Sequence, residues 1–259
     1  MNHVLGEKVK QDLLKLRLKD MAQALEAALQ KAHQQKQGPL QFLAELVQKQ
    51  LQGVENRSVK RRIQNAQLPP NMSFDNFDWN FQPSLNVQYL KDLQELSFIV
   101  NRQPLLILGK TGTGKTHIAT ALGIKACEAG FRVQFYKLQQ LLATLYATLA
   151  DDTTDEIITK LTRIDLLIID HFNYIRTKDE YPSLLLDLVS ACHNNLAIIV
   201  TTSISFEEWG DALGNPSITH AIVDRLFHHA GVINIRPGRS YRSDGPHAPK
   251  IAHPDKPLP

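Results

Sequence analysis

Hydrophobic and polar residues follow two different patterns along this chain. Up to about residue 70, apolar side chains recur every three or four positions, which is the spacing of an amphipathic helix. Further along, short apolar runs appear at 105–108, 166–169 and 196–200, with the length and composition of buried parallel strands. The pattern therefore predicts a helical region followed by an α/β region.

The first part of the chain is expected to form two helices. The first covers residues 5–36, where leucines and one methionine make a single apolar stripe. The Gly38-Pro39 pair interrupts the pattern, and a second helix follows over residues 40–66. We expect the two helices to pack on each other as a hairpin.

Helices and strands are expected to alternate in the remainder of the chain. The predicted helices cover 86–101, 137–149, 181–195 and 217–230, with another beginning after residue 116 and a turn or helix start at 151–156. The predicted strands cover 105–108, 132–136, 165–170, 196–200 and 232–235. Alternation of this kind indicates a parallel sheet covered by helices.

A glycine-rich loop follows the first of these strands. It consists of Gly109, Lys110, Thr111, Gly112, Thr113, Gly114, Lys115 and Thr116, which is the phosphate-loop spacing. Glycines let successive backbone N–H groups face one anion, and the next helix presents its positive N-terminus to the same anion. Lys115 can then reach the outer phosphates, and the Thr116 hydroxyl can ligate Mg²⁺. The alternative is an incidental glycine-rich turn, but the flanking strand and helix favour nucleoside triphosphate binding.

An aspartate ends the strand predicted at 165–170. Asp170 is expected at the carboxyl edge of the sheet, where it would hold Mg²⁺ through water. His171 stands where enzymes of this design need a group that orients or deprotonates water. It is either a neutral imidazole that accepts a proton, or a spacer in a slow or inactive hydrolase.

Four aromatic residues lie in the irregular segment between the two regions. Trp79 and Phe81 are expected to pack on the domain that follows. For Phe74 and Phe77 both packing and a position beside the adenine base remain open. This reading divides the chain into a helical domain (1–68), a linker (69–85), a nucleotide-binding domain (86–243) and a disordered tail (244–259).

Charge is distributed unevenly between these parts. Residues 1–70 contain 12 Lys and Arg and 6 Asp and Glu, whereas the remainder contains 17 and 20. The excess of positive charge suggests a polyanionic partner for the helical domain. Its candidate ridge for DNA phosphates is formed by Lys49, Arg57, Lys60, Arg61 and Arg62. The alternative is a solvated helix surface, and nothing in the ridge implies that DNA bases are read.

Composition limits the remaining classes of protein. The apolar runs are far shorter than a membrane span requires, and residues 1–20 carry charges of both signs, unlike a signal peptide. Cys127 and Cys192 suggest small buried residues rather than a disulfide framework. A cytoplasmic location is the simplest expectation.

Several short segments together resemble one family. They are Leu16–Met21, Phe42–Leu46, Asn56-Arg57, Ile63–Pro69, Phe74–Asp78, the loop 109–119 with His117 after Thr116, Asp165–Asp170, Phe206–Trp209, Ile222–Leu226 and Ser240–Arg242. In order and spacing over residues 8–242, the chain resembles the IstB/DnaC-type ATPases, and in particular the IstB-like helper proteins of insertion-sequence transposases.

The resemblance implies an AAA+ fold: a parallel sheet of five strands, an N-terminal helical domain and a reduced or missing C-terminal lid. It implies ATP and Mg²⁺ as cofactors and ATP hydrolysis. Arg225 matches the arginine finger that would reach a neighbouring subunit's nucleotide, and Arg242 matches the second sensor. Ser203 falls near the first sensor, where the family often has asparagine. His171 is the larger departure, because relatives usually carry a second acidic residue there.

The leading hypothesis is an ATPase switch that assembles as a homo-oligomer on duplex DNA, remodels it and assists the transposase of the same insertion element. One alternative is a replicative helicase loader, and another is a scaffold that binds ATP without hydrolysing it. A small-molecule phosphotransferase is disfavoured, because the sequence shows no pattern for a separate substrate pocket.

Overall fold

The computed structural model describes residues 2–174 and 178–245, and these divide into two compact units. The helical unit ends at Arg61, and the α/β unit begins at Arg62. The tail expected to be disordered lies outside the described residues from position 246 onward. Among the described residues, no helix combines the length and apolar character that crossing a bilayer requires.

Three helices make up most of the helical unit. They are α1 (Asn2–Lys15), α2 (Lys19–Gln34) and α3 (Pro39–Asn65). The prediction of one helix over 5–36 is wrong, because the chain turns at Arg17, whose φ is 62°. The N–H of Leu18 bonds to the carbonyl of Leu13, and the N–H of Arg17 to that of Leu14, so α1 ends in a Schellman-type turn. The apolar period continues through this turn, and no glycine marks it.

Polar contacts join α2 to α3, which agrees with the expected packing of the N-terminal helices. The Gln50 side-chain oxygen accepts from the N–H groups of Asp20 and Met21 at 3.1 and 3.3 Å, and so caps the start of α2. Asp20 also receives two hydrogen bonds from Arg57, at 2.8 and 2.7 Å. A Cβ at Gly53 would lie 2.1 Å from the Asp20 carboxyl, so glycine permits this close approach. Apolar contacts complete the pairing through Met21, Leu25, Ala28 and Leu46.

The described residues of the α/β unit form one parallel sheet. Its strands are β1 (Leu105–Gly109), β2 (Val133–Lys137), β3 (Leu166–Phe172), β4 (Ala197–Thr202) and β5 (Gly231–Ile235). They lie in the order β2-β3-β4-β1-β5. The five predicted strands are therefore confirmed within one to two residues at most ends.

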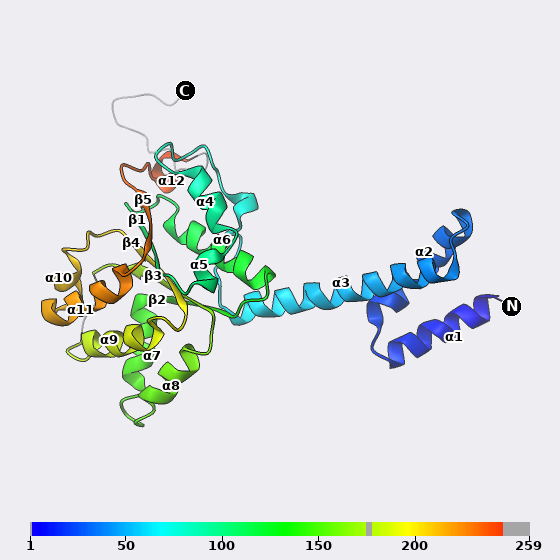
Figure 1. Cartoon of the computed structure of the whole chain (residues 1–259), viewed down its shortest axis with the longest axis horizontal. Coiled ribbons are helices and arrows are strands. Elements are labelled where there is room, and N and C mark those ends of the chain that lie inside the picture. The colour runs from blue at the N-terminus through cyan, green and yellow to red at the C-terminus, as the bar shows by residue number, and fades with distance from the viewer. Residues whose placement is uncertain (1, 175–177, 246–259) are drawn as a thin grey trace, which may run out of the picture. The chain divides into compact units, whose positions relative to one another are not determined.

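Helices lie before, between and after these strands and cover the sheet on both sides (Figure 1). They are α4 (Val87–Leu93), α5 (Ser97–Val100), α6 (Lys115–Glu128), α7 (Leu138–Ala147), α8 (Thr154–Leu161), α9 (Tyr181–Cys192), α10 (Trp209–Leu213), α11 (Pro216–Phe227) and α12 (Tyr241–Asp244), with a 3₁₀ turn at Phe74–Asn76. The predicted helix over 86–101 is wrong in its middle, because Leu96 adopts a φ of 60° and separates α4 from α5.

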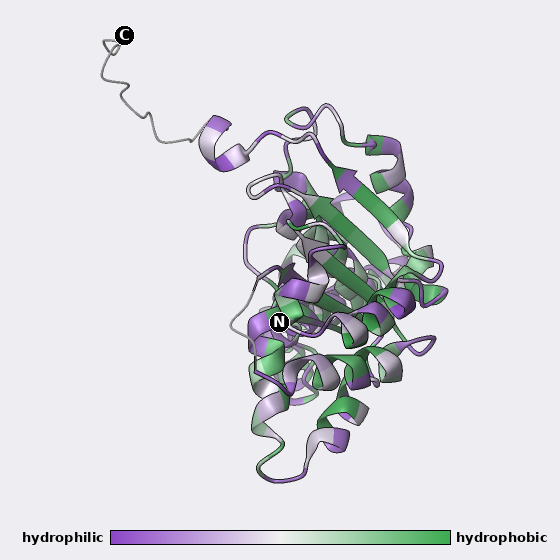
Figure 2. Ribbon diagram, turned by 90° about the vertical axis from the view of Figure 1, so that its left-hand side faces the viewer, coloured by the Kyte–Doolittle hydropathy of each residue, from purple (hydrophilic) through white to green (hydrophobic). Residues whose placement is uncertain are grey.

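Alternate residues of each strand point to opposite faces of the sheet. Leu105 and Ile107 belong to the cluster that includes α4, α5 and α6, whereas Leu106 and Leu108 belong to the cluster that includes α7, α9 and α11. The central strands β1, β3 and β4 are accordingly apolar over most of their length, and Figure 2 shows much of the sheet in green. Cys127 and Cys192 are buried and free as expected, and burial raises the pKa of their thiols to about 11 and about 12.

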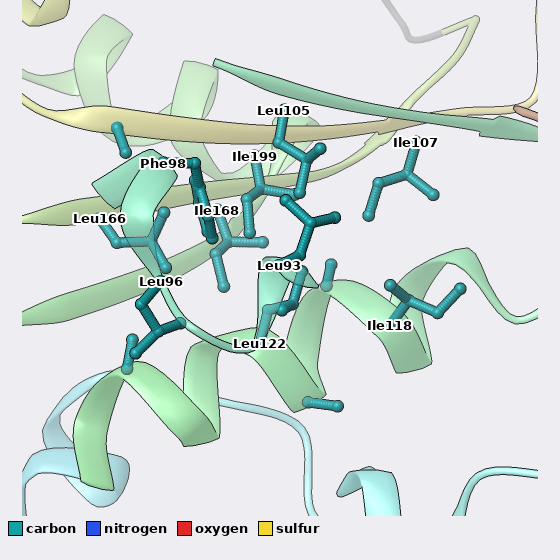
Figure 3. Packing of buried hydrophobic residues seen from close by; sticks show 14 of the residues in the cluster. Leu93, Leu96, Phe98, Leu105, Ile107, Ile118, Leu122, Leu166, Ile168 and Ile199 are labelled. Atoms are coloured by element: carbon teal, nitrogen blue, oxygen red, sulfur yellow. The ribbon is translucent and has the colours of Figure 1, made fainter. Parts of the chain in front are cut away.

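The close-up in Figure 3 shows how α6 is fixed to the sheet. Leu122 points from α6 toward the strands and lies in the same group as Leu93 and Ile168. The Leu122 side chain is fully buried, so the helix that follows the phosphate loop is anchored by its apolar face. The loop is therefore flanked by a buried strand and by a helix packed on the sheet.

We predict that Leu122→Ala lowers the free energy of unfolding of the α/β unit by about 2–5 kcal/mol, because it leaves a cavity under the sheet. Both tryptophans, Trp79 and Trp209, lie in this unit, so their fluorescence in a urea titration reports its unfolding. Leu149, which is 46% exposed, provides the matched control Leu149→Ala, expected to change stability by less than about 0.5 kcal/mol. Equal losses in both variants would contradict this account of the core.

Candidate nucleotide-binding site

A cavity of about 310 Å³ opens beside the carboxyl ends of β1, β3 and β4. The structure brings together there most of the residues that the sequence nominated for nucleotide binding. Those that line the cavity are Thr111, Gly112, Thr113, Gly114, Lys115, Thr116, His117, His171, Ser203, Phe77 and Arg242. Gly109 ends β1, Lys110 begins the loop, and Asp170 lies buried on β3 behind the lining residues.

The phosphate loop connects β1 to α6. Gly112 and Gly114 have φ values of 84° and 96°, a left-handed conformation that side chains disfavour. The Lys115 ammonium donates to the carbonyls of Gly109 and Lys110 at 2.7 and 2.8 Å, so it lies across the loop. The loop and the start of α6 thus collect N–H groups and one cation at the cavity wall.

Electrostatics around Lys115 favour an anionic ligand. The pKa of Lys115 is lowered to about 8, chiefly by burial; the charge of Asp170 opposes this change, and the charges of Arg236 and Arg242 contribute to it. Three basic side chains thus repel one another close to the cavity. A polyanion that binds among them would relieve this repulsion, and phosphate oxygens suit these donors.

Asp170 is the buried centre of the site. Its side chain is fully buried and accepts hydrogen bonds from Thr116 at 2.9 Å and from Thr201 at 2.5 Å. His171 Nδ1 lies 2.6 Å from its other oxygen. Burial raises the pKa of Asp170, but these hydrogen bonds outweigh it, so the net pKa lies below the ordinary value of 3.8. The carboxylate is therefore held ionised inside the protein.

Thr116 and Asp170 fit the needs of a magnesium ion. Both offer oxygen ligands, which Mg²⁺ prefers, and their side chains are already in contact. Within residues 2–174 and 178–245, no three His, Cys, Asp or Glu side chains form a metal cluster of their own. This donor set suits an ion that also takes ligands from water and from nucleotide phosphates.

His171 lies between Asp170 and the cavity. Its φ is 60°, and its N–H donates to the Thr201 hydroxyl at 3.1 Å, which holds this unusual backbone conformation. With Nδ1 directed at Asp170, the other ring nitrogen, Nε2, is left to accept a proton. The half-exposed ring is therefore placed beside the site rather than in the core.

Ser203 belongs to a small polar network that the sequence did not reveal. Its N–H and hydroxyl both donate to the Asn173 side-chain oxygen, at 2.9 and 2.8 Å. Arg236 donates to the Ser203 carbonyl at 3.0 Å. Asn173 and Ser203 both line the cavity, so an amide from the residue after β3 faces it beside the serine. Pairing of β3 with β4 creates this proximity, and no spacing in the sequence signals it.

The aromatic segment closes another side of the cavity. Phe77 lines it, contacts the His117 ring edge-to-face at 5.2 Å and lies against Gly114. Phe81 also lines it, although it was expected only to pack, whereas Trp79 packs against the core as expected. Phe74 is buried, which resolves its open assignment in favour of packing.

Arg225 lies away from this cavity. It lines a second cavity of about 120 Å³ with Pro104, which precedes β1, and Leu196, which precedes β4. This is the opposite end of the strands from the phosphate loop. The Arg225 guanidinium donates to the Ala221 carbonyl at 2.9 Å. Arg225 therefore cannot serve the phosphate loop of its own chain in this structure.

The basic residues of the predicted DNA ridge differ in their surroundings. Arg57 is engaged by Asp20, and the Arg62 side chain donates to the Cys127 carbonyl at 2.7 Å. Lys49, Lys60 and Arg61 are exposed on α3. The structure thus divides the nominated set into side chains with an internal structural contact and side chains open to solvent.

The strand order and the loop between β1 and α6 define an AAA+ P-loop domain, and solved structures share this fold. The AMPPCP-bound DnaA from Aquifex aeolicus matches with a TM-score of 0.53 and 20% identity over 64% of this chain and 51% of that one. The DnaC helicase loader matches with a TM-score of 0.52 and 19% identity over 64% of this chain and 98% of that one.

Sequence comparison identifies the family to which the chain belongs. The chain belongs to the family of IstB-like ATP binding proteins, whose model matches residues 11–246. It is 32% identical to the insertion sequence IS21 ATP-binding protein of Pseudomonas aeruginosa, over 89% of this chain and 86% of that protein. It is 31% identical to the insertion sequence IS232 ATP-binding protein of Bacillus thuringiensis, over 88% and 90%. The resemblance found in the sequence is confirmed.

We predict that Thr201→Val lowers the free energy of unfolding by about 1.5–3 kcal/mol, because a buried carboxylate loses a hydrogen bond of near-ideal length. Thr201→Ser keeps the hydroxyl and is the matched control. Urea unfolding followed by tryptophan fluorescence measures both. A Val variant as stable as the Ser variant would contradict the role assigned to this contact.

The difference in stability between Thr201→Val and Thr201→Ser should depend on pH. The folded pKa of Asp170 lies below 3.8, so its contribution is present above that pH and is lost as pH falls through the folded pKa. Removal of one donor moves the folded pKa toward the unfolded value. The stability difference between the Val and Ser variants should therefore shrink as pH falls below about 4, and a difference that grows there would contradict this sign.

Proposed function

We propose that this protein is an ATP-dependent switch that assembles on duplex DNA, remodels it and assists the transposase of its own insertion element. The observation that carries the proposal is the junction of Lys115, Thr116 and Asp170 at the carboxyl edge of the sheet. The names of its relatives, ATP-binding proteins of insertion sequences, support the biological setting.

In this proposal the chain holds ATP in the cavity of about 310 Å³. The loop N–H groups and Lys115 bind the phosphates, and Phe77 borders the base. Mg²⁺, held by Thr116 and through water by Asp170, would neutralise phosphate charge when bound. Arg242 adds a cation from the segment after β5, on the same cavity wall.

Hydrolysis of ATP is the step in which His171 matters. The Asp170 carboxylate orients its ring, and the remaining nitrogen accepts a proton from the attacking water. This pairing supports a cycling ATPase. A scaffold that binds ATP without turning it over is the second candidate, favoured by the absence of an acidic side chain at position 171. Turnover in the presence of duplex DNA separates the two.

The position of Arg225 supports the proposed assembly of several copies of this chain. Because it lies at the end of the strands opposite the phosphate loop, it can complete only the site of another copy. A neighbour's Arg225 would stabilise charge on the terminal phosphate, and ATP would in turn stabilise the contact between copies. Nucleotide state and oligomeric state are coupled in this way.

The helical unit is proposed to bind the DNA backbone. Lys49, Lys60 and Arg61 are its exposed basic candidates on α3, whereas Arg57 and Arg62 have structural partners. Contacts of this kind neutralise phosphates and do not read bases. The fold shared with DnaC supports helicase loading as an alternative role, and the protein retained by the ATP-bound form, transposase or helicase, decides between them.

We predict that Lys115→Ala reduces ATP affinity at least about 100-fold, because a partly buried cation at the cavity wall is removed from the phosphates. Isothermal titration with MgATP measures the loss. Lys110→Ala is the matched control, since Lys110 is an exposed lysine of the same loop, and it should change affinity less than about threefold. Unchanged binding by the Lys115 variant would remove the basis of the switch.

We predict that Lys60→Ala with Arg61→Ala weakens binding to duplex DNA and reduces the slope of log affinity against log salt by about 1.8, for two lost phosphate contacts. Fluorescence anisotropy over a salt series measures both quantities. The control Lys91→Ala with Arg163→Ala removes the same charges from exposed positions of the α/β unit. Equal slopes in both double variants would show that the α3 residues form only a solvated surface.

A further inference from the structure

A buried amide joins the aromatic linker to the phosphate loop. Gln82 is only 3% exposed, although glutamine is usually found at the surface. Its Nε2 donates to the Arg239 carbonyl at 2.5 Å and to the Thr113 carbonyl at 3.4 Å, and its Oε1 accepts from the Arg239 N–H at 3.1 Å. One side chain therefore satisfies backbone groups of two segments that are far apart in sequence.

The segment that contains Arg239 follows β5 and is here named the strap (residues 236–242). Its backbone contacts the phosphate loop directly, because the Tyr241 N–H donates to the Gly112 carbonyl at 2.9 Å. A Cβ at Gly112 would lie 2.2 Å from the Ser240 hydroxyl, and one at Gly238 would lie 2.8 Å from the Thr113 side chain. Glycines on both sides thus let the strap and the loop approach more closely than side chains would allow.

Aromatic contacts hold the same arrangement on the side of the linker. The Phe81 ring meets Tyr241 edge-to-face with centroids 4.8 Å apart, and the Arg239 guanidinium lies 5.1 Å from the Phe81 centroid. Ser84 donates to the Pro237 carbonyl at 3.3 Å. The linker, the strap and the loop are therefore packed as one body, with the Gln82 amide at its buried centre.

We propose that Gln82 is a positioning residue that fastens the strap to the phosphate loop and so directs Arg242 at the terminal phosphate of a nucleoside triphosphate. Arg242 lines the cavity together with His171 and Ser203, from the end of the strap that Gln82 fixes. The inference rests on the proposed function, because it presupposes that this cavity binds ATP. It goes further by assigning the discrimination between ATP and ADP to a residue in the linker.

Selectivity for ATP over ADP depends on which phosphates each group contacts and on whether Arg242 is already in place when the nucleotide binds. The loop N–H groups bind phosphates that ADP and ATP share, and Lys115 reaches the outer phosphates. A second cation, Arg242, adds affinity mainly for the nucleotide that carries the additional phosphate. A free strap would let Arg242 sample many positions, and the entropy of ordering it would oppose binding. The Gln82 hydrogen bonds place the arginine before the nucleotide arrives.

The test compares Gln82→Met with wild type by isothermal titration of MgATP and MgADP. Methionine fills a similar volume and removes only the hydrogen bonds. We expect ATP affinity to fall about tenfold and ADP affinity to change less than about threefold, as for Arg242→Ala. Gln88→Met is the matched control, because Gln88 is an exposed glutamine of α4 that bonds to Asp92, and it should match wild type.

A double-variant cycle makes the test specific to positioning. If Gln82 acts through Arg242, then Arg242→Ala should cost less than about twofold in ATP affinity when introduced into Gln82→Met. Full additivity of the two losses would overturn the proposal. Equal losses for ATP and ADP in Gln82→Met would overturn it as well, since they would show only a general structural role.

A second variant guards against poor folding of Gln82→Met. Gly238→Ala leaves Gln82 intact but forces a methyl group against Thr113 and the Ile235 carbonyl, which separates strap from loop. It should show the same selective loss of ATP affinity, and wild-type selectivity in this variant would overturn the proposal. Absence of ATP binding by wild type, in contrast, would refute the proposed function itself and not the fastening of the strap.

Discussion

The structure of the site depends on one buried carboxylate. Asp170 lies at the end of β3 and is held by Thr116 from the helix after β1, by Thr201 from β4 and by the neighbouring His171. An ionised carboxylate without water is costly unless several donors surround it, so the three segments must meet in one arrangement. The phosphate loop, the proposed magnesium ligands and the histidine owe their relative positions to this single group.

Around that centre, positive charge collects on one side of the α/β unit. Lys115, Arg236 and Arg242 lie close enough to lower the pKa of the lysine, and the Gln82 amide fixes the segment that carries Arg242. Arg225 is placed at the other end of the strands. The proposed arginine finger thus lies at the opposite end of the strands from the phosphate loop, which suits the proposed assembly of several copies of the chain.

The sequence predicted most of the fold because short apolar strands and the loop spacing are local signals. The break at Arg17 was missed, since a Schellman turn built without glycine leaves the apolar period intact. The contact of Thr201 with Asp170 and the roles of Asn173 and Gln82 were not predicted, because they depend on which strands pair and which segments meet. The pairing of Arg57 with Asp20 could not be foreseen either, because it depends on how two helices face each other.

The most direct test of the account mixes two inactive proteins and measures ATP turnover in the presence of duplex DNA. The Lys115→Ala variant lacks the phosphate-binding lysine but keeps the proposed arginine finger. The Arg225→Ala variant lacks the proposed finger but keeps the lysine. If ATP is hydrolysed in a site shared by two copies, an equal mixture should recover about a quarter of the wild-type rate. In such a mixture about one contact between copies in four joins an intact Lys115 to an intact Arg225. A mixture no more active than its components, beside an active wild type, would contradict the shared site, and an inactive wild type would contradict the switch.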